Sequence, residues 1–113
     1  MKNDIYIHYG KPKLWSNENP IITPDFKLIP DAIFSVKGVQ YFLEVDRFQK
    51  MNANVEKLAQ YKRFKEMESW QKRNMGRFPV VLFYTDKDSR KYQLMELAPE
   101  GLEFQALSKK DLQ

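Results

Sequence analysis

Two strand-like runs separated by only two residues constrain the fold of this chain most strongly. Residues 28–36 and 39–46 are rich in β-branched and aromatic side chains, and only Lys37 and Gly38 lie between them. Two such runs joined by a short turn that contains glycine are typical of an antiparallel β-hairpin. The sequence therefore predicts a hairpin with Lys37 and Gly38 as its turn residues.

This hairpin would bring acidic side chains together on one face. Counting outward from the turn places Asp31 directly opposite Glu44, and opposite residues of an antiparallel pair have Cβ atoms about 4.5–5.5 Å apart. Two like charges at this separation repel, and a divalent cation would compensate them. Mg²⁺ prefers oxygen ligands and commonly takes one or two carboxylates. Asp46 follows two residues after Glu44 and is expected on the same face, so these three residues form a candidate site for Mg²⁺ or Mn²⁺.

The same residues leave two alternatives open. Lysine is not the preferred first residue of a type I′ turn, and a three-residue loop with a bulge would shift the register by one residue. Asp31 and Glu44 would then be near neighbours without being directly opposite. In the second alternative, the carboxylates lie on a solvated face or pair with Lys57 and Arg47.

Other segments predict further strands and a loop. The expected strands are residues 4–9, 79–85, 92–97 and 102–107, with His8 as a strand residue. Residues 10–24 are rich in Pro, Asn and Ser, and we expect them to form a loop that Trp15 anchors to the core.

A single long helix is expected between the hairpin and the later strands. Asn52 or Asn54 would cap its start, and Gly76 and Pro79 would end it near Asn74. A helix of this length can serve as a crossover connection, so the strands on either side of it are predicted to be parallel neighbours in one mixed sheet. The fold class is therefore α/β (α+β), with a mixed central sheet and one long helix.

Composition narrows the possible chemistry. A chain of 113 residues with 42% hydrophobic residues fits one domain with its own core. It has no cysteine, which excludes disulfides and cysteine nucleophiles. It has a single histidine, so a Ser-His-Asp triad is hard to build. No apolar run is long enough to span a membrane and no signal peptide is evident, so a cytoplasmic location is expected.

The charge pattern is compatible with a nucleic-acid partner. The net charge is +4, and basic residues interleaved with Tyr61, Phe64 and Trp70 concentrate in residues 57–77. Such a stretch can contact phosphates, or it can be the solvated face of a helix.

Several short motifs follow one another in a recognisable order. They are Ile-Pro-Asp-Ala (29–32), Phe-Leu-Glu-Val-Asp-Arg (42–47), Lys-Leu-Ala-Gln-Tyr (57–61) and Val-Val-Leu-Phe-Tyr-Thr (80–85), followed by Arg90. Together they resemble the core of the replication-relaxation family of plasmid, phage and conjugative-element proteins. That family in turn resembles PD-(D/E)XK nucleases, which have a restriction-endonuclease-like core. The resemblance covers roughly residues 15–107.

The resemblance implies roles for individual residues. Asp31 matches the aspartate of the PD element and Glu44 the (D/E) position, both metal ligands in active members. Val45 matches the X position, whose backbone carbonyl often helps to bind the metal. Asp46 stands where the motif has lysine. In some members the lysine comes from the following helix, and Lys57 is the candidate here, with a surface lysine as the alternative.

The function implied is metal-dependent DNA processing of the nuclease or relaxase type, with catalysis by Asp31, Glu44 and Lys57. The alternative is a catalytically inactive nuclease-fold domain that binds DNA or proteins of a replication or mobilisation complex. Tyr61 resembles a core tyrosine, although a covalent link to DNA is another reading. Residues 1–113 are expected to form a single domain without the winged-helix region usual in the family. The oligomeric state does not follow from the sequence.

Overall fold

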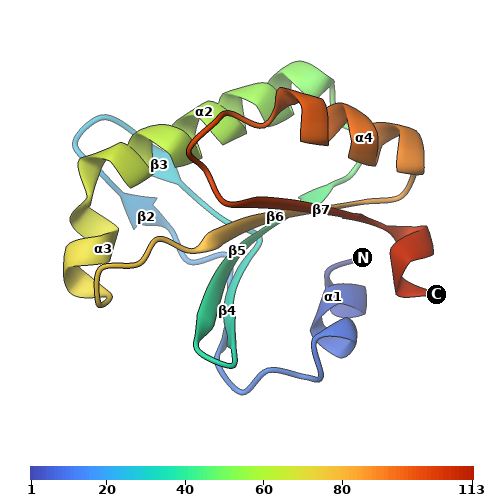
Figure 1. The fold of residues 1–113 in the computed structure, drawn as a ribbon, viewed down its shortest axis with the longest axis horizontal. Coiled ribbons are helices and arrows are strands. Elements are labelled where there is room, and N and C mark those ends of the chain that lie inside the picture. Colours follow the sequence, from blue (N-terminus) through green and yellow to red (C-terminus); the bar gives the residue numbers. More distant parts are fainter.

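A five-stranded mixed sheet lies at the centre of the structure, a computed structural model that describes residues 1–113 (Figure 1). The strands, in spatial order, are β1 (Trp15–Asn17), β4 (Ala32–Val36), β5 (Val39–Asp46), β6 (Val80–Thr85) and β7 (Phe104–Ser108). The pairs β1–β4 and β4–β5 are antiparallel, whereas β5–β6 and β6–β7 are parallel. Two short strands, β2 (Ile21–Ile22) and β3 (Lys27–Leu28), form a separate antiparallel pair.

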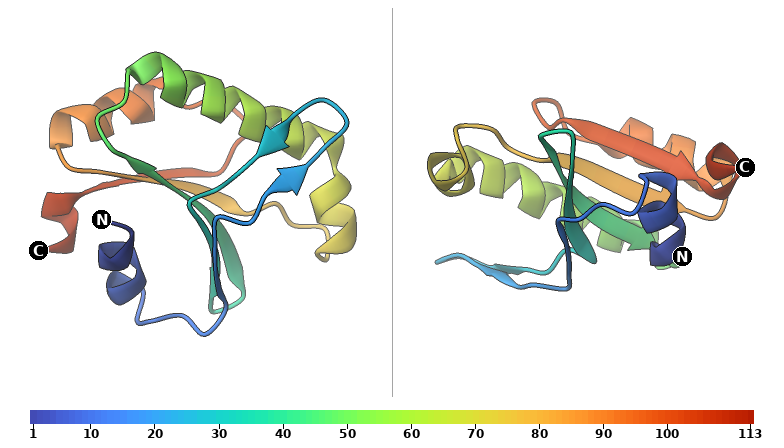
Figure 2. Two further views of the ribbon diagram at one scale, coloured as in Figure 1. Left: turned by 180° about the vertical axis from the view of Figure 1, so that it is seen from behind. Right: turned by 90° about the horizontal axis from the view of Figure 1, so that it is seen from below.

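Helices cover both faces of the sheet (Figures 1 and 2). The long α2 (Met51–Met67) and α4 (Asp88–Leu97) lie over one face, with the short α3 (Ser69–Arg73) directly after α2. The helix α1 (Lys2–His8) and the C-terminal 3₁₀ helix η1 (Lys109–Leu112) lie on the opposite side. None of these helices has the length and apolar character needed to cross a membrane.

The core consists of two apolar clusters, one on each face of the sheet. Phe42 of β5 belongs to the cluster under α2 and α4, together with Tyr61. The neighbouring Leu43 and Val45 belong to the cluster under α1. Because side chains alternate along a strand, Glu44 projects toward α2 from the same face as Phe42.

The hairpin is confirmed, with the register that the sequence predicts. The paired residues of β4 and β5 run from Val36 opposite Val39 to Ala32 opposite Leu43. Lys37 has φ 51° and Gly38 has φ 81°. A type I′ turn needs positive φ at both central residues, so lysine accepts the left-handed conformation here and the alternative three-residue loop does not occur.

The crossover is also confirmed, because α2 connects β5 to β6 and these two strands are parallel neighbours. Residues 79–85 and 102–107 lie largely in β6 and β7, as predicted. Trp15 lies in a short edge strand, β1, and its ring stacks on that of Phe34, which confirms its anchoring role.

Two of the expected strands are helices instead. Residues 4–9 fall largely in α1, where Ile5 is buried and Tyr9 packs against the same cluster. A spacing of four residues fits a helix face as well as it fits strand alternation, so the short pattern was ambiguous. Residues 92–97 belong to α4, which buries Leu94 and carries Asp88 in its first turn, where an acidic side chain is favourable.

The prediction of one long helix is also wrong. α2 begins at Met51, so Asn52 and Asn54 lie inside it, and no side chain caps its start. It ends at Met67 because Glu68 adopts a left-handed conformation with φ 59°, after which α3 begins. Four α-helices are present in all.

Candidate functional site

Asp31 and Glu44 come together at the end of the hairpin that is remote from its turn. Asp31 immediately precedes β4, and its N–H donates to the carbonyl of Leu43 at 2.9 Å. Its carboxylate Oδ2 accepts a hydrogen bond of 2.7 Å from the N–H of Val45. These two bonds hold Asp31 against β5 on both sides of Glu44. The proximity expected from the hairpin register is therefore present.

Glu44 is almost buried, with 8% of its surface exposed, and α2 supplies its partners. The Nζ atom of Lys57 lies 3.4 Å from its Oε2, and the Tyr61 hydroxyl donates a hydrogen bond to the same oxygen. Burial raises the pKa of Glu44 to about 7, since Lys57 and Tyr61 offset only part of the cost and the charge of Asp31 adds to it. Near neutral pH this carboxyl group is therefore partly protonated.

Lys57 connects both sides of the site. Its ammonium group also donates to the carbonyl of Ile29 at 3.0 Å, in the segment that leads to Asp31. Arg47 is more exposed than Asp31, and its Nη1 atom lies 3.6 Å from Oδ1 of Asp31. The pairing of the carboxylates with Lys57 and Arg47, which the sequence left open, thus occurs together with their convergence.

Asp46 belongs to a different set of contacts. It is fully buried, and Arg90 of α4 binds both of its carboxylate oxygens at 2.5 and 2.9 Å. Thr85 donates to it at 2.9 Å, and Asn54 at 3.4 Å. Burial alone would raise its pKa, but the hydrogen bonds from Arg90, Thr85 and Asn54 outweigh burial and lower it.

The role of Asp46 as a third metal ligand stays a prediction, and these contacts give it no support. Both of its carboxylate oxygens accept hydrogen bonds from Arg90, so its charge is already paired within the protein. Val45 turns its side chain into the opposite core cluster and uses its N–H to hold Asp31. The structure contains no group of three or more His, Cys, Asp or Glu residues arranged to hold a metal ion.

Asp31 and Glu44 by themselves still fit a hard divalent cation. Mg²⁺ commonly takes one or two carboxylates and completes its coordination with water and substrate phosphate. Both carboxylates are held by hydrogen bonds or ion pairs from this chain, which orients them as ligands require. We define Asp31, Glu44, Lys57 and Tyr61 as the acidic site.

Two side-chain contacts of Glu44 and Asp46 do not follow from the sequence. The sequence favours Tyr61 as a core residue and places it one helical turn after Lys57, but it does not predict the hydrogen bond from Tyr61 to Glu44. Arg90 was noted only as part of a motif, and no local pattern connects it with Asp46, which lies 44 positions earlier.

No family model, curated protein or solved structure matches this chain. The resemblance to replication-relaxation proteins stays a prediction that depends on the motifs alone.

Proposed function

We propose that this chain is a metal-dependent DNA-processing domain of the nuclease or relaxase type, from a plasmid, phage or conjugative element. One observation carries the proposal: the Lys57 ammonium group lies 3.4 Å from Glu44, which adjoins Asp31. Two carboxylates beside one lysine are the components of a PD-(D/E)XK site. Lys57 would here replace the lysine that the motif carries at the position of Asp46. The hairpin, crossover helix and parallel strand supply the framework that such a core requires.

In this proposal each residue has a defined task. Asp31 and Glu44 would hold Mg²⁺ or Mn²⁺, which when bound polarises a phosphate and acidifies a water molecule. Lys57 would stabilise the negative charge that develops on the phosphate, because its ammonium group is close and only partly exposed. Tyr61 would orient Glu44 through its hydrogen bond. With a pKa of about 7, Glu44 could also accept a proton before the metal binds.

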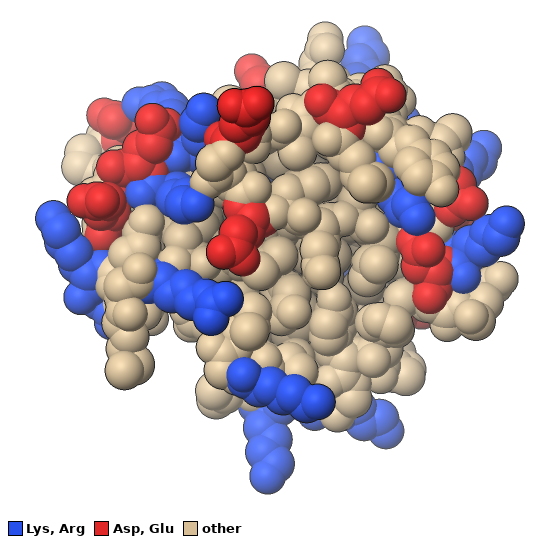
Figure 3. All heavy atoms as spheres, viewed as in Figure 1, with Lys and Arg blue, Asp and Glu red and all other residues tan.

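The charge distribution on one face of the molecule limits how DNA could bind there. In the orientation of Figure 1, Lys and Arg side chains alternate with acidic ones around the edges of the molecule, and the middle of this face carries little charge (Figure 3). A broad basic footprint is therefore absent from this face. Non-specific phosphate binding alone would be weak and sensitive to salt.

The alternative is a nuclease-fold domain without catalytic activity that binds DNA or a protein partner. It is favoured by the lysine position of the motif, where Asp46 is bound by Arg90. In this case the pairing of Lys57 with Glu44 and of Arg47 with Asp31 would be purely structural.

Substitution of Lys57 separates the two functions. Lys57→Ala and Lys57→Met should each reduce the rate of DNA cleavage with Mg²⁺ or Mn²⁺ by a factor of about 10²–10³, because one transition-state contact is lost. DNA affinity should change much less. The measurement is a time course on supercoiled and single-stranded DNA. Lys62→Met is the matched control, since Lys62 lies in the same helix and is absent from the salt bridges of the structure.

The outcomes discriminate clearly. Wild-type cleavage that both Lys57 variants retain would show that the lysine assignment is wrong. No cleavage by the wild type with either metal, with DNA binding preserved, would favour the inactive alternative.

A further inference from the structure

A groove between α1 and β1, on the face of the sheet opposite α2, has no role in the proposed chemistry. We infer that it binds a nucleotide of a single DNA strand whose path continues to the acidic site. The inference rests on the proposed function, and it adds the form of the substrate: a single strand in which a base next to the reacting phosphate is unstacked.

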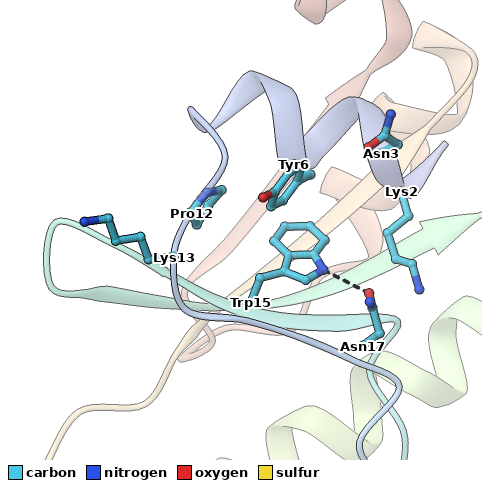
Figure 4. Close-up of a pocket in the computed structure, with 7 residues that line it drawn as sticks. All are labelled: Lys2, Asn3, Tyr6, Pro12, Lys13, Trp15 and Asn17. Carbon is cyan, nitrogen blue, oxygen red and sulfur yellow. Dashed lines mark hydrogen bonds between the residues drawn. The ribbon is translucent and has the colours of Figure 1, made fainter.

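The groove has the size and lining of a ligand site. Its volume is about 430 Å³, within the range of about 300–1,000 Å³ that small-molecule sites occupy. Figure 4 shows the aromatic rings of Tyr6 and Trp15 next to each other, with Lys2 and Lys13 on either side. No acidic residue lines the groove.

The Trp15 ring is held in place before any ligand arrives. One neighbour, Phe34, stacks on it with centroids 4.9 Å apart, and Tyr6 meets it edge-on at 5.1 Å. The indole N–H donates to the side chain of Asn17 at 2.9 Å. A fixed aromatic ring loses little conformational entropy when a base packs on it, and stacking of this kind tolerates any base.

Lys2 connects the groove with the backbone of Asp31. Lys2 lines the groove, and its Nζ donates to the backbone carbonyl of Asp31 at 3.2 Å. Asn17 also lines the groove and pairs with Ala32, the residue that follows Asp31. The acidic site faces α2, so a strand with a base at Trp15 would have to pass around the end of β4 beside Lys2 to bring a phosphate near Asp31.

Charge and base geometry together favour a single strand as the occupant. Lys2 and Lys13 match a phosphate backbone, while the aromatic rings match the face of an unpaired base. Bases inside a duplex are stacked on one another and do not present that face. The exposed carboxylate of Glu18 lies 4.0 Å from Lys2, so its negative charge should weaken the binding of a DNA strand.

The fluorescence of Trp15 provides the test. Trp70→Phe leaves Trp15 as the single tryptophan, and this variant serves as the parent for all others. Titration with oligodeoxythymidylate in EDTA should quench its emission. An abasic strand of equal length should bind at least about 5-fold more weakly, which corresponds to the loss of about 1 kcal/mol of stacking.

Charge variants refine the test. Lys13→Gln should lower the slope of log affinity against log salt concentration by about 0.7, as loss of one phosphate contact to a single strand does. Glu18→Gln should strengthen binding. Lys72→Gln, in α3, is the matched control and should leave the slope unchanged. Absence of quenching, equal binding of the abasic strand, or an unchanged slope for Lys13→Gln would each overturn the inference.

The design separates this inference from the proposed function. The Asp31→Asn, Glu44→Gln double variant lacks the acidic site but should still quench with oligodeoxythymidylate. Quenching without cleavage would retain the groove and reject the catalytic function. Cleavage without quenching would reject the groove and retain the function.

Discussion

Glu44 and Asp46 lie two residues apart on the same face of β5, yet their surroundings shift the pKa values of the two carboxyl groups in opposite directions. Asp46 is fully buried and bound by Arg90 through two hydrogen bonds, and its pKa is lowered. Glu44 has one lysine at 3.4 Å and one tyrosine hydroxyl, and its pKa is raised to about 7.

The difference concerns how completely each charge is compensated. A bidentate guanidinium pair with further hydrogen bonds satisfies a buried carboxylate almost fully, so the charge of Asp46 needs no further cation to compensate it. The ionised form of Glu44 remains destabilised, since Lys57 and Tyr61 do not fully offset the cost of desolvation. Binding of a cation or a proton would compensate the buried negative charge. Two carboxylates only two residues apart in one strand can thus differ in how far their charge is compensated.

The largest effect is expected from breaking the Asp46 pair. Arg90→Met should lower the free energy of unfolding by about 3–5 kcal/mol, because it leaves Asp46 buried without its main partner. Urea denaturation measures this change. Lys91→Met is the matched control in the next position, where the partner carboxylate, Asp111, is 32% exposed and not buried, so its effect should be smaller. Similar losses in both variants would contradict the distinction between the two carboxylates.

The second prediction concerns the pH dependence of stability that Glu44 causes. The pKa of Glu44 is 4.5 in the unfolded chain and about 7 in the folded protein, so the folded state binds this proton more tightly. The protonated Glu44 side chain therefore contributes fully to the free energy of unfolding below about pH 4.5. This contribution is lost as the pH rises to about 7, which lowers the free energy of unfolding by about 3 kcal/mol.

Glu44→Gln should abolish this dependence. We expect the variant to gain stability relative to the wild type as the pH rises from about 4.5 to about 7. Urea denaturation in EDTA at a series of pH values measures the difference. If the free energies of unfolding of the two proteins changed with pH in parallel, the charge of Glu44 would be fully compensated, like that of Asp46.

The third prediction is stabilisation by metal. Mg²⁺ or Mn²⁺ at 100 times its dissociation constant should add about 2.7 kcal/mol and raise the melting temperature. The Asp31→Asn, Glu44→Gln double variant should lose this response and melt at a higher temperature than the wild type without metal. Asp46→Asn should keep the metal response, although it destabilises the fold. A response that persists in the double variant would locate the metal elsewhere.

The smallest effect is expected from Tyr61→Phe, which removes only the hydroxyl group bound to Glu44. The loss of one hydrogen bond to a charged group should cost about 1.5 kcal/mol. The pKa of Glu44 should rise further, because this hydrogen bond favours the ionised form. The pH titration of stability described above measures both quantities. An unchanged profile would mean that Tyr61 does not orient Glu44.

The sequence could predict the part of the acidic site that depends on local pairing. Two strand runs around Lys37 and Gly38 determine the register, and the register places Asp31 beside Glu44. The resemblance to the family motifs made Lys57 the candidate lysine, and pairing of the carboxylates with Lys57 was also left open; the structure places its Nζ atom 3.4 Å from Glu44. These inferences succeeded because strand alternation and helix periodicity fix which side chains share a face.

The segments that sequence reasoning assigned wrongly are short and weakly patterned. Residues 4–9 and 92–97 carry apolar spacings that fit a strand or a helix equally well, and tertiary packing of Ile5 and Leu94 decided between them. The break at Glu68 likewise depends on a left-handed backbone that its residue type does not favour.

The sequence by itself determined the hairpin, the crossover and the meeting of Asp31 with Glu44, because each follows from the spacing of residues close together in the chain. Only the tertiary structure decided that Asp46 is neutralised by Arg90 and that Trp15 and Lys2 border a groove next to Asp31. The physical reason is that compensation of a buried charge depends on which distant side chains the fold packs against it. No local pattern encodes that choice.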